Sequence, residues 1–352
     1  MKYFITPILS LLGGLVAVGI YEWIRVPSIG YVTQILLTVL LLSVLEISLS
    51  FDNAVVNAAV LKNMSEVWKN RFLTWGMLIA VFGMRFFFPL LIVSVIGNMS
   101  LWDSAVLSFS KPDEYSKMML ESHLAVSAFG GSFLLMVFLN FMISDEKELH
   151  WIKLIEKPAA KLAAFQSIEL VIALLVMMGI YVNLPAADHV TFLVAYLWGI
   201  ITFLVVHGIS ELLENEQISR MAWLKSGFGM FLYLEVLDAS FSFDGVVGAF
   251  AISNQLVVIM AGLGIGAFFV RGLTLYLVEK NTLSQFMFLE HGAFYALGVL
   301  ALFMLCDSFF HFSEAVTAIS GALILVISIL WSIKVDRQSA AEQNQKSPES
   351  LE

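Results

Sequence analysis

Two copies of one acidic pattern lie inside apolar stretches of this chain, about 190 residues apart. The first copy reads EISLSFDN from Glu46, and the second reads DASFSFDG from Asp238. The copies align without a gap as acid-x-Ser-x-Ser-Phe-Asp. Carboxylates are costly in hydrocarbon, so an acid within a membrane-length apolar run marks a functional site. The duplication predicts one site assembled from two halves of the chain.

Helical geometry divides the first copy into two faces. Successive residues of an ideal helix turn by about 100°, so Glu46, Ser50 and Asn53 share one stripe, which Asn57 extends. Asp52 falls well off this stripe. A break in the helix between the two acids would let both carboxylates point inward and would free main-chain oxygens as further ligands.

The polar groups of both copies are hard oxygen donors, which suit Mn²⁺, Mg²⁺ and Ca²⁺ better than softer metals. Carboxylates in a low-dielectric site must hold protons or a cation. The predicted metal ligands are Glu46, Asp52, Asn53, Asp238 and Asp244. The predicted substrate pathway adds Ser48, Ser50, Asn57, Ser240, Ser242 and Glu169.

Two arginines inside apolar runs, Arg85 and Arg271, are the predicted counter-charges of these acids. An alternative is that acids and arginines simply form structural ion pairs. Two arginines can neutralise only half of four carboxylates. We therefore favour a site in which the arginines balance charge while no cation is bound.

Composition places the chain in a membrane. Hydrophobic residues make up 59% of the chain and charged residues 13%, against a usual charged share of about 25%. The formal net charge of −9 argues against a nucleic-acid partner. A single cysteine, Cys306, excludes an internal disulfide and a cysteine-based metal site. The lipid bilayer is the partner that this composition predicts.

Ten apolar runs predict about ten transmembrane helices in an all-α multi-pass fold. They cover residues 3–22, 31–61, 71–97, 123–143, 163–185, 189–211, 226–251, 256–278, 291–310 and 315–334. With ten spans, fourteen basic residues fall on the side that holds both termini, and only Arg25, Lys111 and Lys117 fall on the other. This asymmetry predicts that both termini are cytoplasmic.

The repeat extends beyond the acids. Gly76 and Arg85 align with Gly262 and Arg271, and a His-to-Gly spacing starting at His123 recurs later in the chain. The predicted repeats are residues 1–186 and 187–334, each of five helices with a broken motif helix, followed by a disordered cytoplasmic tail at 335–352. An odd number of spans per half inverts the second repeat relative to the first.

The paired motifs resemble the TerC family of membrane proteins, which is linked to tellurite resistance and grouped in the LysE transporter superfamily. The resemblance covers roughly residues 30–330 and rests on Glu46, Asp52-Asn53-Ala54 and Arg85, with the second acidic copy and Arg271. It matches an uncharacterised bacterial branch most closely. It implies acidic metal ligands, manganese export and a multi-pass protein of the bacterial cytoplasmic membrane. Gly245, where the first copy has Asn53, leaves the metal open.

The leading hypothesis is therefore a divalent-cation transporter, with Mn²⁺ the expected ion, working by alternating access and without enzymatic activity. Two alternatives stay open: a membrane scaffold in a metal, tellurite or envelope stress complex, and a LysE-like amino-acid exporter. A homo-oligomer is compatible with each. An intramembrane aspartyl protease is disfavoured because Ala267 follows Gly264-Ile265-Gly266, where that class needs aspartate.

Overall fold

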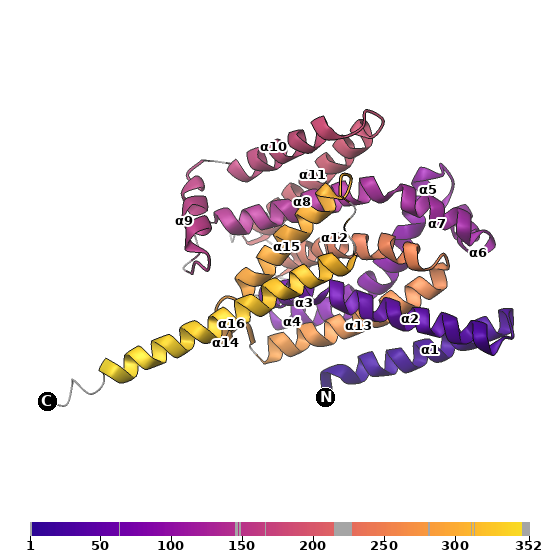
Figure 1. Cartoon of the computed structure of the whole chain (residues 1–352), viewed down its shortest axis with the longest axis horizontal. Helices are drawn as coiled ribbons and strands as arrows, with labels where there is room; N and C mark the ends of the chain where they lie inside the picture. The colour runs from indigo at the N-terminus through magenta and orange to yellow at the C-terminus, as the bar shows by residue number, and fades with distance from the viewer. Residues whose placement is uncertain are drawn as a thin grey trace.

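The computed structural model describes residues 2–62, 64–144, 147, 149–165, 167–214, 227–280, 282–310, 312 and 314–346. Within these ranges the chain is helical and contains no strand (Figure 1). Eight described helical stretches are long and apolar enough to cross a membrane, which confirms an all-α multi-pass membrane protein. They are α1 (Ile5–Arg25), α2 (Ile29–Leu49), the rod Glu66–Ile96, α8 (His123–Ile143), α11 (His189–Glu214), α13 (Leu256–Glu279), α15 (Leu289–Cys306) and α16 (Glu314–Lys346).

The other two predicted spans are also helices, but they differ from the eight. Helix α10 (Ile168–Asn183) has 16 residues and is therefore about 24 Å long, shorter than a hydrocarbon core of about 30 Å. Helix α12 (Phe228–Ile252) has 25 residues but carries Glu235, Asp238 and Asp244 in its apolar sequence. Each of the ten predicted segments thus contains a described helix, while the exact number of spans stays a prediction.

Shorter elements link these helices or complete them. The rod Glu66–Ile96 comprises α4 (Glu66–Arg71), two π-helical stretches η2 (Phe72–Gly76) and η3 (Ile79–Phe87), and α5 (Phe88–Ile96). The remaining elements are η1 (Lys2–Phe4), α3 (Phe51–Lys62), α6 (Leu101–Ser110), α7 (Pro112–Glu121), α9 (Lys153–Leu162) and α14 (Thr282–Gln285).

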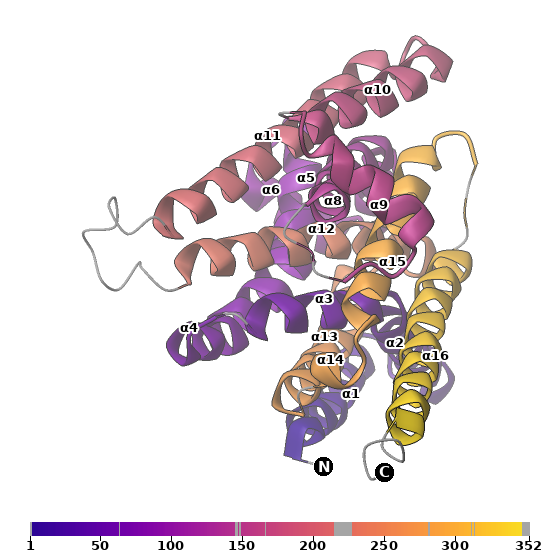
Figure 2. The ribbon, with the colours of Figure 1, turned by 90° about the vertical axis from the view of Figure 1, so that its left-hand side faces the viewer.

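Burial separates an inner set of helices from an outer set. Most of the apolar window of α8, α13 and α15 is buried inside the protein, whereas α1 and α16 leave most of theirs uncovered. Leu9 of α1 and Ile319 of α16 expose 63% and 64% of their surface. Figures 1 and 2 show α12 and α15 in the middle of the bundle. The uncovered leucines and isoleucines therefore form the surface expected to face lipid.

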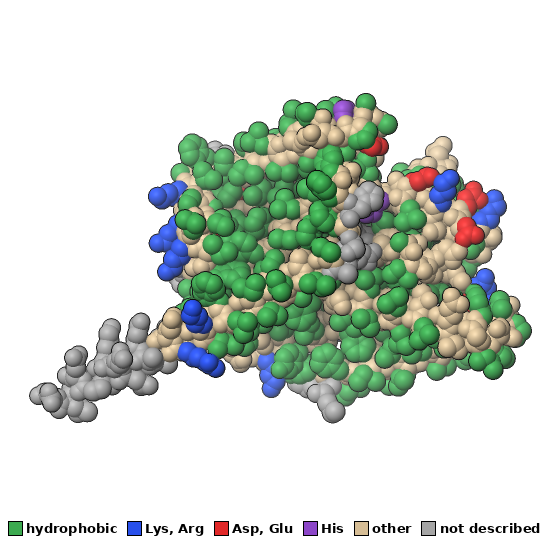
Figure 3. Space-filling view, in the orientation of Figure 1, with side chains coloured by type: hydrophobic (Ala, Val, Ile, Leu, Met, Phe, Trp, Pro, Cys, Tyr) green, Lys and Arg blue, Asp and Glu red, His purple; other side chains and the backbone are tan. Residues whose placement is uncertain are grey.

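The space-filling view agrees with this division. On the face shown in Figure 3, hydrophobic side chains cover the middle of the protein. Lysine and arginine side chains gather at the left end and below it, and the acidic side chains lie toward the right with further lysine or arginine side chains beside them. The charges therefore lie at the two ends of a broad apolar zone.

Small residues bring the inner helices together, as is common where helices pack in membranes. Helix α13 packs along α2, and α8 packs along α11, α12 and α15. A Cβ atom at Gly266 of α13 would lie 2.5 Å from the Cβ of Glu46. Helix α15 also packs on α3, so each predicted half sends one helix against the acidic helix of the other.

Two predicted features differ in detail from the structure. The first acidic helix is interrupted at Ser50, between α2 and α3, but α12 runs unbroken through the second copy. The interruption is slight, because the amide of Ser50 still donates to the Glu46 carbonyl at 3.0 Å and that of Ala54 to the Ser50 carbonyl at 3.1 Å. The predicted disordered tail is helical as far as Lys346, where the described chain ends.

Candidate functional site

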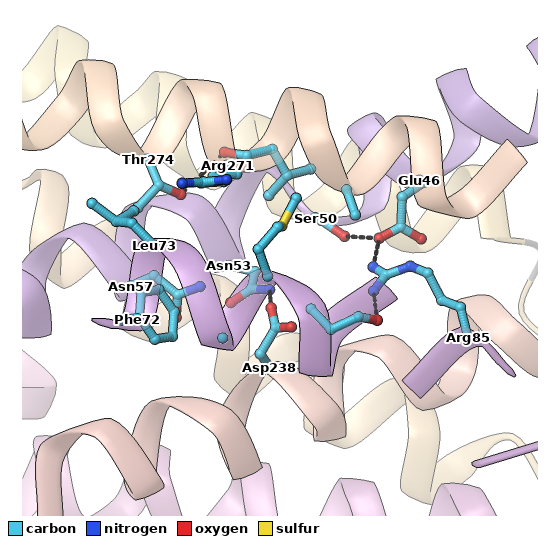
Figure 4. Close-up of a pocket in the computed structure, with 15 residues that line it drawn as sticks. Glu46, Ser50, Asn53, Asn57, Phe72, Leu73, Arg85, Asp238, Arg271 and Thr274 are labelled. Carbon is cyan, nitrogen blue, oxygen red and sulfur yellow. Dashed lines mark hydrogen bonds and ion pairs between the residues drawn. The ribbon is translucent and has the colours of Figure 1, made fainter. Parts of the chain in front are cut away.

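A small cavity joins the two acidic patterns inside the bundle (Figure 4). It has a volume of about 40 Å³ and lies between α2 and α3, the π-helical stretches of the rod, α12 and α13. Its polar lining comes from both predicted halves: Glu46, Ser50, Asn53, Asn57, Arg85, Asp238, Arg271 and Thr274. The fold thus brings Glu46 and Asp238 to one cavity, as the duplicated pattern predicts.

Glu46 forms a buried ion pair with Arg85. Its side chain and that of Arg85 are both 3% exposed, and the Arg85 guanidinium donates to the Glu46 carboxylate. The Ser50 hydroxyl donates to the same carboxylate oxygen at 3.1 Å. Because removing either charge strands the other in a low-dielectric interior, this pair is expected to be essential to the site's stability.

Asp238 is held differently. The side-chain amide of Asn53 donates to the Asp238 carboxylate at 2.6 Å, a bond that joins α3 to α12. In the described part of the chain Asp238 forms no ion pair, although Arg271 lines the same cavity. The aligned positions of the two arginines would pair Arg271 with Asp238 as Arg85 is paired with Glu46. Among the described residues, the structure shows the pair of Arg85 with Glu46 and no pair of Arg271 with Asp238.

Two amide oxygens in the lining lack a hydrogen-bond donor. The Oδ1 atoms of Asn53 and Asn57 are buried and accept no hydrogen bond within the described structure, and the two residues are only 2% and 4% exposed. A buried acceptor without a partner costs about 1–3 kcal/mol. A cation or a water molecule in the cavity that reached either oxygen would satisfy it.

Asp52 does not reach this cavity. It lines a separate cavity of about 10 Å³, formed with Ser48 and with residues of α15 and α16. Helical geometry explains the separation, because six residues after Glu46 the chain has turned by about 240° beyond a full turn. Since the backbone hydrogen bonds continue through Ser50, the break does not rotate Asp52 to the same side as Glu46.

The other predicted site residues are placed as follows. Ser240 is buried and donates to the carbonyl of Val236 in its own helix, and Ser242 is also buried. Glu169 lies in the first turn of α10, away from the cavity of Glu46. The backbone of Asp244 lies in α12, but its side chain is outside the described part of the structure. Among the described side chains, no three of the His, Cys, Asp and Glu type come together as metal ligands.

One acid beside the site is absent from the predicted set. Glu235 precedes Asp238 by one helical turn, and its buried Oε1 atom has no hydrogen-bond partner in the described structure. A Cβ atom at Gly76 of η2 would clash with this oxygen, so the glycine makes room for the carboxylate. The sequence signal was available, because an acid three residues before Asp238 falls on the same helix face.

Comparison with known proteins places the chain in a family. A family model described as "Protein of unknown function (DUF475)" matches residues 51–339. The chain belongs to the DUF475 family. The match covers the helices that supply most of the cavity, but Glu46 lies just before it.

A curated relative is also a membrane protein. The chain is 30% identical over 104 residues to the "Uncharacterized membrane protein YceF" of Bacillus subtilis (strain 168). The match covers 28% of this DUF475 protein and 39% of the relative, so the chain spans about two fifths of the relative's length. No solved structure matches the chain. These findings agree with the apolar helices in showing a multi-pass membrane protein.

Proposed function

We propose that this DUF475 protein transports a divalent cation, with Mn²⁺ as the expected ion. The observation that carries the proposal is the cavity that Glu46 and Asp238 line together with the unpartnered oxygens of Asn53 and Asn57. Carboxylate and amide oxygens are the ligands that hard divalent cations prefer. A site of this chemistry deep in apolar helices has its most direct use in moving an ion across the membrane.

The size of the cavity favours an ion over an amino acid. A volume of about 40 Å³ admits a water-sized ligand, because about 10–15 Å³ of such volume holds one water molecule. A lysine-sized substrate needs several times this space. The size of the cavity therefore favours the cation-transporter hypothesis over the amino-acid exporter. No feature of the cavity supports the scaffold hypothesis.

Alternating access through inverted repeats is supported by paired helix contacts. Helix α8 packs on α12, and α15 packs on α3, which are equivalent contacts if the halves are exchanged. Among the described residues, the ion pair between Arg85 and Glu46 has no counterpart at Asp238 and Arg271, so the two sides of the site are unequal. Such inequality is expected of a transporter captured with access to one side.

The direction and location of transport rest on the TerC resemblance and the basic residues. We place the protein in the bacterial cytoplasmic membrane with both termini in the cytoplasm, and we propose export. The proposal assigns the protein to transport, without enzymatic activity. Possible assembly with copies of itself or with stress-response proteins is secondary to it.

The test is Mn²⁺ flux into liposomes that contain the purified protein and a trapped metal indicator. Asp238→Asn should weaken Mn²⁺ binding by about tenfold or more, equivalent to about 1.4 kcal/mol, and should slow the flux. Glu22→Gln is the matched control, because Glu22 is fully buried and paired with Arg25 at 3.2 Å, away from the cavity.

A normal flux in Asp238→Asn would contradict the transport role of this site. Cellular metal content, measured element by element with and without the protein, identifies the ion and the direction. If no element changes and the purified protein moves no cation, the scaffold becomes the better explanation.

A further inference from the structure

Asp52 is a buried carboxylate without a counter-charge. It is 6% exposed, and in the described part of the chain it has no ion-pair partner. Its carboxylate accepts a hydrogen bond from the neighbouring amide of Asn53 at 3.0 Å. An isolated carboxylate in such a position is costly unless a cation or further donors reach it.

The space beside Asp52 is built from small residues. Its cavity of about 10 Å³ is bordered by Ala318, Gly321 and Ala322 of α16 and by Ala296 of α15. A Cβ atom at Gly321 would lie 3.5 Å from a carboxylate oxygen of Asp52 and 3.9 Å from the Cβ of Ala296. The lining also contains Thr317 and Ser48, whose hydroxyls are oxygen donors like the carboxylate.

A much larger cavity begins next to this space. We call it the vestibule: a volume of about 460 Å³ between α7, α8, α12, α15 and α16. Thr317 lines both the vestibule and the cavity of Asp52. The other polar side chains of the vestibule are His123, Ser127, Asp188, Asp307 and Ser308.

The vestibule has two carboxylates among its polar lining residues, and Glu46 does not line it. Asp307 pairs with His123 at 3.2 Å, while Asp188 brings a further carboxylate. The helix ends that surround the vestibule are those that the distribution of basic residues predicts to lie on the non-cytoplasmic side of the membrane. Glu46 and Asp52 are only six residues apart in the sequence, but they line different cavities on different faces of the α2–α3 helix.

We propose that Asp52 is a second cation station, separate from the site of Glu46 and Asp238, which receives or releases the ion through the vestibule. The ligand is a hard divalent cation, bound by the Asp52 carboxylate with Thr317 and Ser48 close by. The two acids of one sequence pattern then serve successive steps of one path. This inference rests on the proposed function.

The experiment asks whether an ion at Asp52 shields Thr317. Thr317→Cys is made in a Cys306→Ser background, and its modification by a small charged thiol reagent is timed with and without Mn²⁺. With Mn²⁺ at ten times its Kd, about a tenth of the sites stay empty, so modification should slow about tenfold. The shielding should persist with Asp238→Asn and disappear with Asp52→Asn.

Two controls guard against indirect effects. Ser110→Cys lies at an exposed position outside both cavities, and its modification should not respond to Mn²⁺. Gly321→Val keeps the carboxylate but fills the space beside it, and should remove the shielding as Asp52→Asn does. This second variant separates loss of the station from misfolding caused by the charge change.

The inference is overturned if shielding survives Asp52→Asn, if it disappears with Asp238→Asn alone, or if Mn²⁺ never shields Cys at 317. Flux measured on the same preparations separates the two hypotheses. Normal flux without shielding removes the second station and leaves the transporter in place. Absence of both flux and shielding removes the proposed function itself.

Discussion

At the scale of single residues, the two arginines of the site are in unequal positions. Both arginines line the cavity, but Arg85 is paired with the buried Glu46 carboxylate, whereas Arg271 forms no ion pair with a described carboxylate. The same residue type at equivalent places in the repeat should therefore contribute differently. We therefore expect Arg85 to stabilise the fold and Arg271 to raise the electrostatic potential of the cavity.

This difference gives a prediction. Arg85→Gln strands the buried Glu46 carboxylate and should reduce the free energy of unfolding by about 3–5 kcal/mol. Arg271→Gln should cost far less stability and should tighten Mn²⁺ binding, because it removes a positive charge from the cavity. Thermal unfolding and metal titration of the purified variants measure both effects.

A double variant sharpens this comparison. Glu46→Gln combined with Arg85→Gln removes both charges and should be more stable than Arg85→Gln alone. Equal destabilisation by Arg85→Gln and Arg271→Gln would show that both arginines are structural, as the ion-pair alternative holds.

At the scale of elements, the site depends on how closely α13 approaches α2. A Cβ atom at Gly266 would lie 2.5 Å from the Cβ of Glu46 and 2.9 Å from the carbonyl oxygen of Ser43. These contacts are with a backbone oxygen and a Cβ atom, and neither can move without a shift of the helix backbone. The glycine therefore sets the spacing of the two helices beside the site.

Gly266→Ala should accordingly push α13 from α2 and lower stability by about 1–3 kcal/mol. Gly264→Ala is the matched control, because its Cβ would meet Val81 at 3.5 Å, an ordinary contact. Both changes carry the same gain in helix propensity, so their difference reports packing. Thermal unfolding measures it, and equal stability of the two variants would refute the role of Gly266.

A second element, α9, is fastened by one buried acid. Glu156 is fully buried and accepts hydrogen bonds from the amides of Trp151 and Ile152 at 3.2 and 3.1 Å. The Tyr295 hydroxyl of α15 donates to it at 3.2 Å. This carboxylate therefore ties the connector formed by residues 149–162, which contains Lys153, Lys157 and Lys161, to the inner helix α15.

Glu156→Ala should release the connector locally. Trypsin should then cut after Lys153 or Lys161 faster than in the parent protein, while the spanning helices stay protected. Glu290→Gln is a control at an exposed acid of α15. An unchanged cleavage rate in Glu156→Ala would mean that other contacts hold α9.

At the scale of the whole molecule, the basic residues predict the orientation in the membrane. Single cysteines in a Cys306→Ser background test it with a reagent that does not cross the bilayer. Ser110→Cys should react from outside intact cells, whereas Ser65→Cys and Ser144→Cys should react only after lysis. The reverse pattern would invert the protein and with it the proposed direction of transport.

The sequence alone predicts the site only in part, and the reason is visible in its residues. The stripe of Glu46, Asn53 and Asn57 follows from helical periodicity, and the structure brings these residues to one cavity. The position of Asp52 could not be read in this way, because it depends on how little the helix changes direction at Ser50. The periodicity of the sequence determines which residues share a face of a helix. The size of the bend at Ser50 depends instead on how the helix packs against residues far away in the sequence.

The same distinction applies to the fold. Apolar runs of membrane length predicted the helices, since hydrocarbon leaves the backbone few alternatives. The contact of Gly266 with Glu46 joins residues far apart in the chain, so the periodicity of the apolar residues along the sequence does not predict it. The unequal roles of Arg85 and Arg271 are also invisible in the alignment of the two halves, which places them at equivalent positions.

The short helix α10 has a consequence for the surrounding lipid. As a predicted span, α10 with its 16 residues would cover several ångströms less than the thickness of an average bilayer. Where Leu175 and Val182 face outward, with 66% and 70% of their surface exposed, the acyl chains must compress or the helix ends must draw headgroups inward. The membrane beside α10 should therefore be thinner than elsewhere around the protein, and short-chain lipids should collect there.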